Sequence, residues 1–344
     1  MNNPQDHTPS TKHSKNKRKK SALILDEDDL SLKQPEIRLE PDDKERMTLN
    51  PGRSLKSSSK DLPKFMKLTF RHSLPAFVMA YFITYLPGKI SAAILANLAH
   101  RMPVIYHNEI MFRNISGWEK VDALSIFSAP IVTDFLCAVL FGSLFNLFKH
   151  ASGIWRYLLF WLMVLSYTRF AGCVLPGRVS GQEFGYVAGW LYMGAVGYAV
   201  CFVLSLVLMA AGALLLGQWA LETAFSRHMI LPANRQRYLA NLVGYPAIGG
   251  SLVIALYHLL DWSYLFKGAL VWNDVWSSRQ EFTFLVETWL MWFGMAGSLL
   301  IFRDRTIINQ RDLRVQRFQS FWVILFFVLP LALRIALGYG WSWY

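Results

Sequence analysis

The stretch ALSIFSAPIVTDFLCAVLFGSLFNLF, residues 123–148, decides the fold class of this chain. Asp134 is its only charged residue. The stretch is longer than the roughly 20 residues with which a helix crosses the hydrocarbon core of a bilayer. Because lipid offers the backbone no hydrogen-bond partners, such a segment satisfies its amides and carbonyls by forming a helix. It therefore predicts a transmembrane helix.

Six other stretches have the same apolar character. They run approximately over Leu74 to Leu98, Tyr157 to Leu175, Tyr192 to Trp219, Val243 to Phe266, Phe282 to Phe302 and Phe321 to Leu337. Of the 344 residues in the chain, 53% are hydrophobic and 17% are charged, which excludes an ordinary soluble domain. The sequence predicts an all-α, polytopic helical membrane protein with about seven transmembrane helices over residues 73–344.

Two of these stretches are irregular. Pro87, Gly88 and Lys89 interrupt the first one, which predicts a kink or a break into two half-helices. The fourth is longer than one bilayer crossing when it is counted from Phe184, so we expect its first portion to lie at the membrane interface.

The chain before the first span is charged and polar. Residues 1–60 lack aromatic side chains and are rich in Ser, Lys, Asp and Glu, which predicts a disordered tail. Residues 61–72 mix apolar and basic residues and predict an interfacial lead-in helix. The basic run Lys15 to Lys20 suits anionic lipid headgroups or nucleic acid. A solvated cytoplasmic tail that sets orientation is the favoured explanation, so we expect contact with anionic lipid headgroups and no nucleic-acid partner.

Lysine and arginine near the span ends predict the orientation of the chain. With the tail inside, the inner loops carry Lys149, Arg156, Arg227, Arg235, Arg237, Arg303, Arg305, Arg311, Arg314 and Arg317. The outer loops carry Arg101, Arg113, Lys120, Arg178, Lys267 and Arg279. This asymmetry predicts a protein of the bacterial inner membrane with a cytoplasmic amino end and an outer carboxyl end.

Five charged residues within the predicted spans are candidate functional residues, because an ionised group is costly in the hydrocarbon core. They are Asp134, Arg169, Asp261, Glu287 and Arg334. Neighbouring spans and similar depths predict an Asp134–Arg169 pair and a Glu287–Arg334 pair. Asp261 lies at a similar outer depth. Either these groups form a proton or ion relay, or the pairs are structural and fix helix register.

The segment from Leu175 to Trp190 is the most distinctive loop. Its constrained or charged positions are Pro176, Gly177, Gly181, Glu183 and Gly185. Such a segment predicts either a re-entrant loop, which needs protein or a water cavity around it, or a constrained turn that leads into an interfacial helix.

Metal and cofactor chemistry has little support. His100, His107 and Glu109 are the only candidate metal ligands, and no H-E-x-x-H motif accompanies them. The three cysteines lie in apolar runs, which excludes a disulfide-rich secreted module. The sequence predicts no bound cofactor.

One stretch resembles a known family. Ser128-Ala129-Pro130, with Asp134 four residues after the proline, is similar to the second-helix signature of site-2-protease-type membrane metalloproteases. The resemblance extends to the turn after Pro176, where Glu183 would match the acidic zinc ligand of that family. The region Ile90 to Met102 lacks the zinc-binding H-E-x-x-H of the family, so the resemblance implies a protease-like fold without catalysis.

These observations predict a non-enzymatic component or scaffold of a membrane assembly, with the lipid bilayer and other membrane subunits as partners. The main alternative is a transporter or ion-coupled permease that uses Asp134, Arg169, Glu287 and Arg334 along a pathway. An intramembrane enzyme is a weaker alternative.

Overall fold

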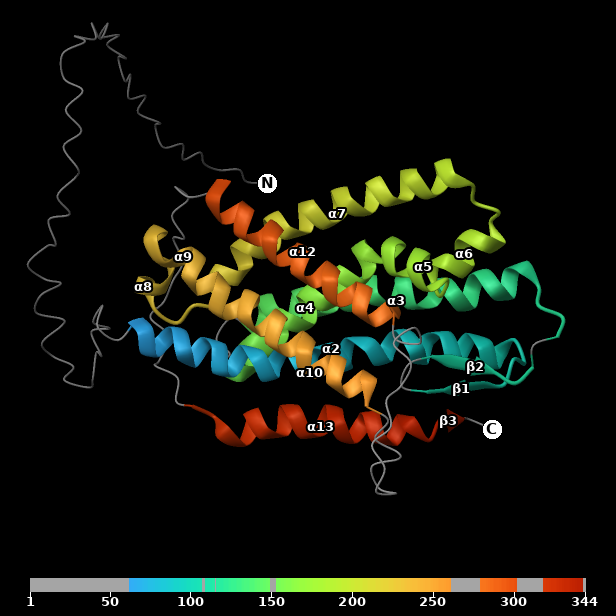
Figure 1. Ribbon diagram of the computed structural model, residues 1–344, viewed down its shortest axis with the longest axis horizontal. Helices are drawn as coiled ribbons and strands as arrows, with labels where there is room; N and C mark the ends of the chain where they lie inside the picture. Colours follow the sequence, from blue (N-terminus) through green and yellow to red (C-terminus); the bar gives the residue numbers. More distant parts are fainter. Residues whose placement is uncertain are drawn as a thin grey trace, which may run out of the picture. The chain divides into compact units, whose positions relative to one another are not determined.

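The computed structural model describes residues 62–106, 109–114, 116–148, 153–260, 279–301 and 318–342 (Figure 1). The elements are α2 (Leu62–Leu98), β1 (Pro103–Ile105), β2 (Ile110–Phe112), α3 (Lys120–Leu147), α4 (Ile154–Gly172), α5 (Val174–Ser180), α6 (Phe184–Trp190), α7 (Ala195–Glu222), α8 (Arg227–Ile230), α9 (Pro232–Leu239), a π-helical turn η2 (Ala240–Gly244), α10 (Tyr245–Leu259), α12 (Arg279–Ile301), α13 (Ser320–Gly338) and β3 (Trp341–Ser342). The predicted tail, residues 1–60, lies outside the described residues, as do Asp261 and His107.

Within the described part of the chain, six helical segments are long and apolar enough to cross a membrane. They are α2, α3, α7, the continuous run from α9 to α10, α12 and α13. The pair α4 and α5, which is bent by 63°, makes a seventh crossing if it counts as one span. The chain is thus an all-α polytopic membrane protein, and the fold-class prediction is confirmed.

The long segments run across the bundle in alternately opposite directions, from left to right and back in Figure 1. At one end, β1 pairs with β2 directly after α2, and β3 pairs with β1 directly after α13. Arg279, the first residue of α12, donates to the Ser180 carbonyl at that same end. At the opposite end, Arg156 at the start of α4 donates to the Glu222 carbonyl at the end of α7. We call the first of these the hairpin end, after the β1–β2 hairpin.

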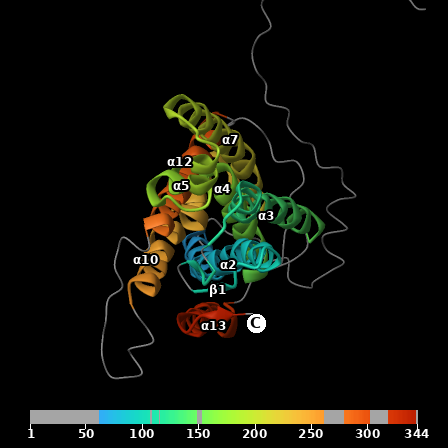
Figure 2. The same ribbon diagram turned by 90° about the vertical axis from the view of Figure 1, so that its right-hand side faces the viewer.

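Helix α4 lies at the centre and packs against α2, α3, α7 and α12 (Figure 2). Most of its residues are buried, including Trp161 and Leu165. Because neighbouring helices surround α4, it needs less hydrophobicity than a helix that faces lipid. The outer faces of α3 and α7, in contrast to α4, expose large apolar side chains such as Leu136 and Val203. Such faces suit contact with lipid.

Helix α2 is continuous from Leu62 to Leu98, so of the two predicted alternatives at Pro87, a kink or a break, the break is wrong. The predicted lead-in residues form the first turns of this same helix, where Met66 and His72 are buried. Gly88 instead lets α3 approach closely, because a Cβ there would lie 3.3 Å from the Pro130 side chain. The segment that begins at Phe184 was expected to be separate from the fourth span. It forms the short helix α6, which is distinct from α7.

Candidate functional site

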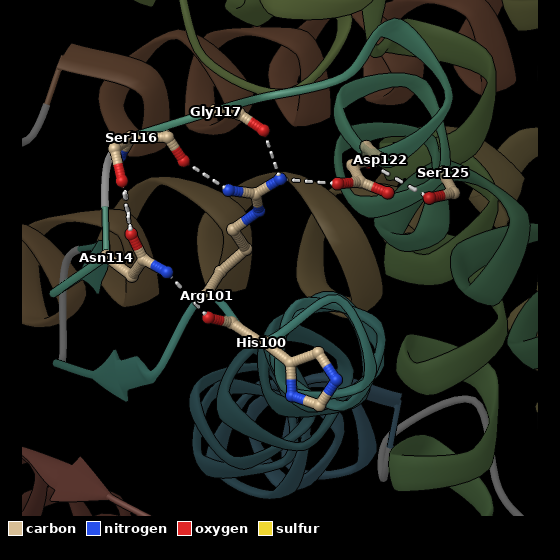
Figure 3. A network of polar contacts seen from close by, with 7 residues as sticks. All are labelled: His100, Arg101, Asn114, Ser116, Gly117, Asp122 and Ser125. Atoms are coloured by element: carbon tan, nitrogen blue, oxygen red, sulfur yellow. Dashed lines mark hydrogen bonds and ion pairs between the residues drawn. The ribbon is translucent and has the colours of Figure 1, made fainter.

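The loop after the β1–β2 hairpin is held by the buried side chain of Arg101 (Figure 3). Its guanidinium donates to the Ser116 carbonyl at 2.6 Å, to the Gly117 carbonyl at 2.7 Å and to the Asp122 carboxylate at 2.6 Å. It also lies over the ring of Trp118, 5.0 Å from its centroid. A bidentate guanidinium suits this task because its donors are fixed in one plane. Arg101 therefore fixes the position of the Trp118 ring.

Trp118 forms part of a half-open cavity of about 350 Å³ at the hairpin end. Helices α2, α3 and α6, the hairpin and the α5–α6 turn supply the walls. The lining residues are Lys89, Ala92, Glu109, Ile110, Phe112, Trp118, Ile126, Phe127, Pro130, Gln182, Glu183, Tyr186 and Trp190. This volume falls in the range of small-molecule pockets, about 300 to 1,000 Å³. A lining of many apolar and few polar groups is also typical of such pockets.

One wall of the cavity consists of aromatic rings in contact with one another. Phe112 meets Trp118 edge to face at 5.2 Å, Trp118 stacks on Phe127 at 5.7 Å, and Phe127 stacks on Tyr186 at 4.3 Å. Rings packed in this way hold one another in place. The wall is therefore rigid and apolar, although the rings come from β2, α3 and α6 and from the loop before α3.

The polar part of the cavity contains an ion pair. The Lys89 ammonium lies 3.6 Å from the Glu183 carboxylate and 5.3 Å from the centroid of the Tyr85 ring. The Lys89 side chain is only 7% exposed. Charge-assisted hydrogen bonds are shorter than this separation, at about 2.7 to 2.9 Å, so the pair is a charge contact without a hydrogen bond. Among the residues that the structure describes, no acceptor hydrogen-bonds the ammonium.

Glu183 owes its position to the glycine-rich turn that the sequence singled out. Gly181 ends α5 with a positive φ of 73°, and Glu183 itself has a φ of 45°, which is uncommon for a residue with a side chain. A Cβ on Gly185 would overlap the Gly177 carbonyl, so both glycines permit α5 and α6 to pack closely. The outcome is a tight helical hairpin in which Pro176 and Gly177 are buried.

A second polar cluster lies deeper in the bundle. Arg169 on α4 donates to the Glu281 carboxylate on α12 at 3.2 Å, and Tyr81 on α2 donates to the same carboxylate oxygen. The Tyr81 hydroxyl is also 3.1 Å from Nε2 of His258. The Arg169 guanidinium lies over the ring of Phe284 at 4.0 Å. Four helices thus contribute to one buried network around a single ion pair.

This network shows that the predicted pairs are wrong. Arg169 pairs with Glu281 and not with Asp134, whose Oδ1 is buried without a hydrogen-bond partner among the described residues. Arg334 donates to the carbonyls of Tyr257 and His258 at 2.7 and 3.0 Å. It does not contact Glu287, and Oε2 of this buried carboxyl group also lacks a partner in the described part of the chain.

The structure describes two of the three metal candidates, Glu109 and His100. Glu109 lines the cavity, and His100 contributes its backbone carbonyl to Asn114 (Figure 3). His107 lies outside the described residues. Within the residues that are described, no group of three or more His, Cys, Asp or Glu side chains could hold a metal ion. Glu183, which the resemblance matched to a zinc ligand, faces the Lys89 cation instead, so the residues present do not fit a zinc ion.

Sequence reasoning missed two parts of this region. Glu281 was placed one residue outside its span, although it follows Arg279 and Gln280 at the start of an apolar run. The strands were missed as well. A signal for them exists in the short triplets Pro103–Ile105 and Ile110–Phe112 on either side of a polar turn.

Comparison with protein-family models, with curated proteins and with solved structures finds no match to this chain.

Proposed function

We propose that the protein is a non-enzymatic component of a membrane assembly in the bacterial inner membrane. The observation that carries this proposal is a lateral groove of about 310 Å³ between α3 and α7. Small residues line its α3 side, namely Ala138, Gly142 and Ser143, whereas the space at Gly212 on α7 is filled by the Tyr167 ring. Small side chains let the backbones of two helices approach closely within a bilayer. A transmembrane helix of another subunit is therefore the proposed occupant.

The test of this proposal is a pull-down through the amino-terminal tail from mild detergent. Val139 lines the groove and is 53% exposed, so Val139→Trp blocks the groove without changing the core. Leu252 is 74% exposed on α10 and does not line the groove, so Leu252→Trp is the matched control. We expect a stoichiometric membrane subunit to accompany the wild type and the control but not Val139→Trp. A lone monodisperse species for the wild type contradicts the proposal.

The proposed orientation places the hairpin end outside the cell and the amino end in the cytoplasm, where the tail contacts anionic headgroups. The bias of lysine and arginine towards the opposite end supports it. Met111 on β2 and Ala233 at the start of α9 are exposed residues near opposite ends of the bundle. In a variant without native cysteines, Met111→Cys should react with an impermeant thiol reagent in intact cells, and Ala233→Cys should react only after lysis. The reverse pattern contradicts this orientation.

A second candidate function is ion-coupled transport. It is favoured by the carboxyl groups of Asp134 and Glu287, each of which keeps a buried oxygen without a partner among the described residues. Arg169 and Arg334 support it less, because their guanidinium groups are held by Glu281 and by backbone carbonyls. A hydrated pathway would expose the position next to Asp134, so Thr133→Cys should react with a water-soluble thiol reagent. Complete protection of this cysteine favours the scaffold.

A further inference from the structure

The cavity at the hairpin end combines three features that no single structural role explains. It has a rigid aromatic wall, a buried ammonium group and two carboxylates. The Lys89 ammonium has three donors and, among the described residues, no hydrogen-bond acceptor. A buried cation normally acquires acceptors, because desolvation is otherwise uncompensated. The Lys89 ammonium can therefore donate to an oxygen of a ligand in the cavity.

The charges of the lining residues restrict what can supply this oxygen. Among the described residues of the lining, Lys89 is the only cation, whereas Glu109 and Glu183 are anions. A purely anionic ligand would satisfy Lys89 but would meet two carboxylates. A purely cationic ligand would satisfy the carboxylates but would meet Lys89. A zwitterionic group complements both signs, since its anionic oxygens contact Lys89 and its ammonium faces the carboxylates and the aromatic rings.

The depth of the cavity identifies the rest of the ligand. Lys89 lies nine residues before the end of α2, or about 14 Å along the helix axis at 1.5 Å per residue. The lining combines Trp118 and Trp190 with apolar residues of α2 and α3 such as Ala92 and Ile126. Amphipathic rings of this kind gather where a membrane meets water. The ligand therefore has a polar head near the surface of the membrane and an apolar body.

We propose that this cavity binds a zwitterionic phospholipid, whose phosphate contacts Lys89 and whose ammonium faces Glu183 and Glu109. The glycerol and the first methylene groups lie against the aromatic wall. Gln182, which also lines the cavity, supplies a further amide donor for the phosphate or an ester carbonyl. The inference depends on the membrane location of the chain and not on its proposed role in an assembly.

The test measures lipid binding to the full-length protein in mild detergent by native mass spectrometry. The probes are phosphatidylethanolamine, phosphatidylglycerol and diacylglycerol with identical acyl chains. Phosphatidylglycerol keeps the phosphate and lacks the ammonium, and diacylglycerol lacks both. We expect phosphatidylethanolamine to bind about tenfold or more tightly than either of the other two lipids. Equal binding of phosphatidylethanolamine and phosphatidylglycerol overturns the proposal, as does the absence of binding.

Variants assign the binding to the cavity. Lys89→Met with Glu183→Gln removes both charges together and leaves no buried ion alone, so the fold should persist. Its matched control is Lys120→Met with Glu119→Gln, which removes one exposed charge of each sign at the same end. Tyr186→Ala removes a ring that is 45% exposed and lines the cavity, and Tyr192→Ala removes an exposed ring that does not. The two cavity variants should bind phosphatidylethanolamine about tenfold more weakly and the two controls should not change. Unchanged binding in the cavity variants overturns the proposal.

Discussion

Nη2 of Arg169 lies 3.2 Å from Oε2 of Glu281, although 112 positions separate the two residues in the chain. The contact joins the central helix α4 to α12 within the membrane-spanning part of the bundle. The Glu281 side chain is buried at 3% exposure and the Arg169 side chain is 11% exposed, so the pair is largely shielded from solvent. Removing one partner of such a pair leaves the other charge uncompensated.

Arg169→Leu is therefore expected to destabilise the protein by about 3 to 5 kcal/mol. The double variant Arg169→Leu with Glu281→Leu should recover most of the loss, because no buried charge is left alone. Thermal unfolding and yield in detergent measure the effect. Arg169→Leu with Asp134→Leu is the control, and rescue by this control instead would contradict the assignment of Glu281 as the partner.

Two glycines of α6, Gly185 and Gly189, allow a controlled test of how closely α5 and α6 pack. A Cβ at position 185 would overlap the Gly177 carbonyl, which belongs to the backbone and cannot move aside without shifting α5. Gly185→Ala is therefore expected to cost about 1 to 3 kcal/mol of stability. A Cβ on Gly189 meets nothing within 4 Å, so Gly189→Ala should be neutral or slightly stabilising in the same thermal assay. Equal effects of the two substitutions would exclude close packing of α5 and α6.

The indole of Trp161 provides a third prediction. Its N–H donates to Ser73 Oγ at 2.8 Å, and the Ser73 hydroxyl in turn donates to the Leu242 carbonyl in the π-helical turn η2. Ser73→Ala leaves both buried groups without this partner, which is expected to cost about 1 to 3 kcal/mol. The exposed Ser143 hydroxyl bonds only within its own helix, so Ser143→Ala is the control. A similar loss of stability for both variants would show that the buried bond contributes little.

Arg101 should control the order of the loop that carries Trp118. Arg101→Lys keeps the charge but cannot reach two carbonyls and a carboxylate in one plane. We expect amide hydrogen exchange over residues 114–122 to accelerate several-fold while exchange within α4 is unchanged. Lys120→Gln, which alters an exposed charge nearby, should leave exchange over residues 114–118 as in the wild type. Unchanged exchange in Arg101→Lys would mean that the loop is held by other contacts.

The sequence was sufficient for the helical architecture because hydrophobicity and length are local properties. Hydropathy identified the six membrane-spanning segments and the bent α4–α5 pair, although the fifth predicted span begins earlier than expected, at Pro232. The buried pairs could not be predicted in the same way. Position along a helix gives the depth of Asp134 and Arg169, whereas pairing depends on the rotation of each helix and on which helix is the neighbour. Glu281 reaches Arg169 because α12 packs on α4, and no property of either segment alone indicates this.

The candidate site was predicted in part. The glycine-rich turn around Glu183 was identified from its unusual composition, and Glu109 was singled out for a different reason, as a metal candidate. Lys89 was noticed only as an interruption of the first span. Its place in a cavity depends on long-range packing of α2, α3 and α6, which local sequence patterns do not encode.

The three-stranded sheet at the hairpin end has a consequence for biogenesis. Its order is β2-β1-β3, with Val104 of β1 opposite both Met111 and Ser342. β1 is synthesised after the first membrane helix, whereas β3 is synthesised after α13. One edge of β1 therefore stays unpaired while the intervening helices enter the bilayer, and only a fully inserted polypeptide can complete the sheet. Pairing of β3 is thus a late maturation step that distinguishes finished molecules from partly inserted ones.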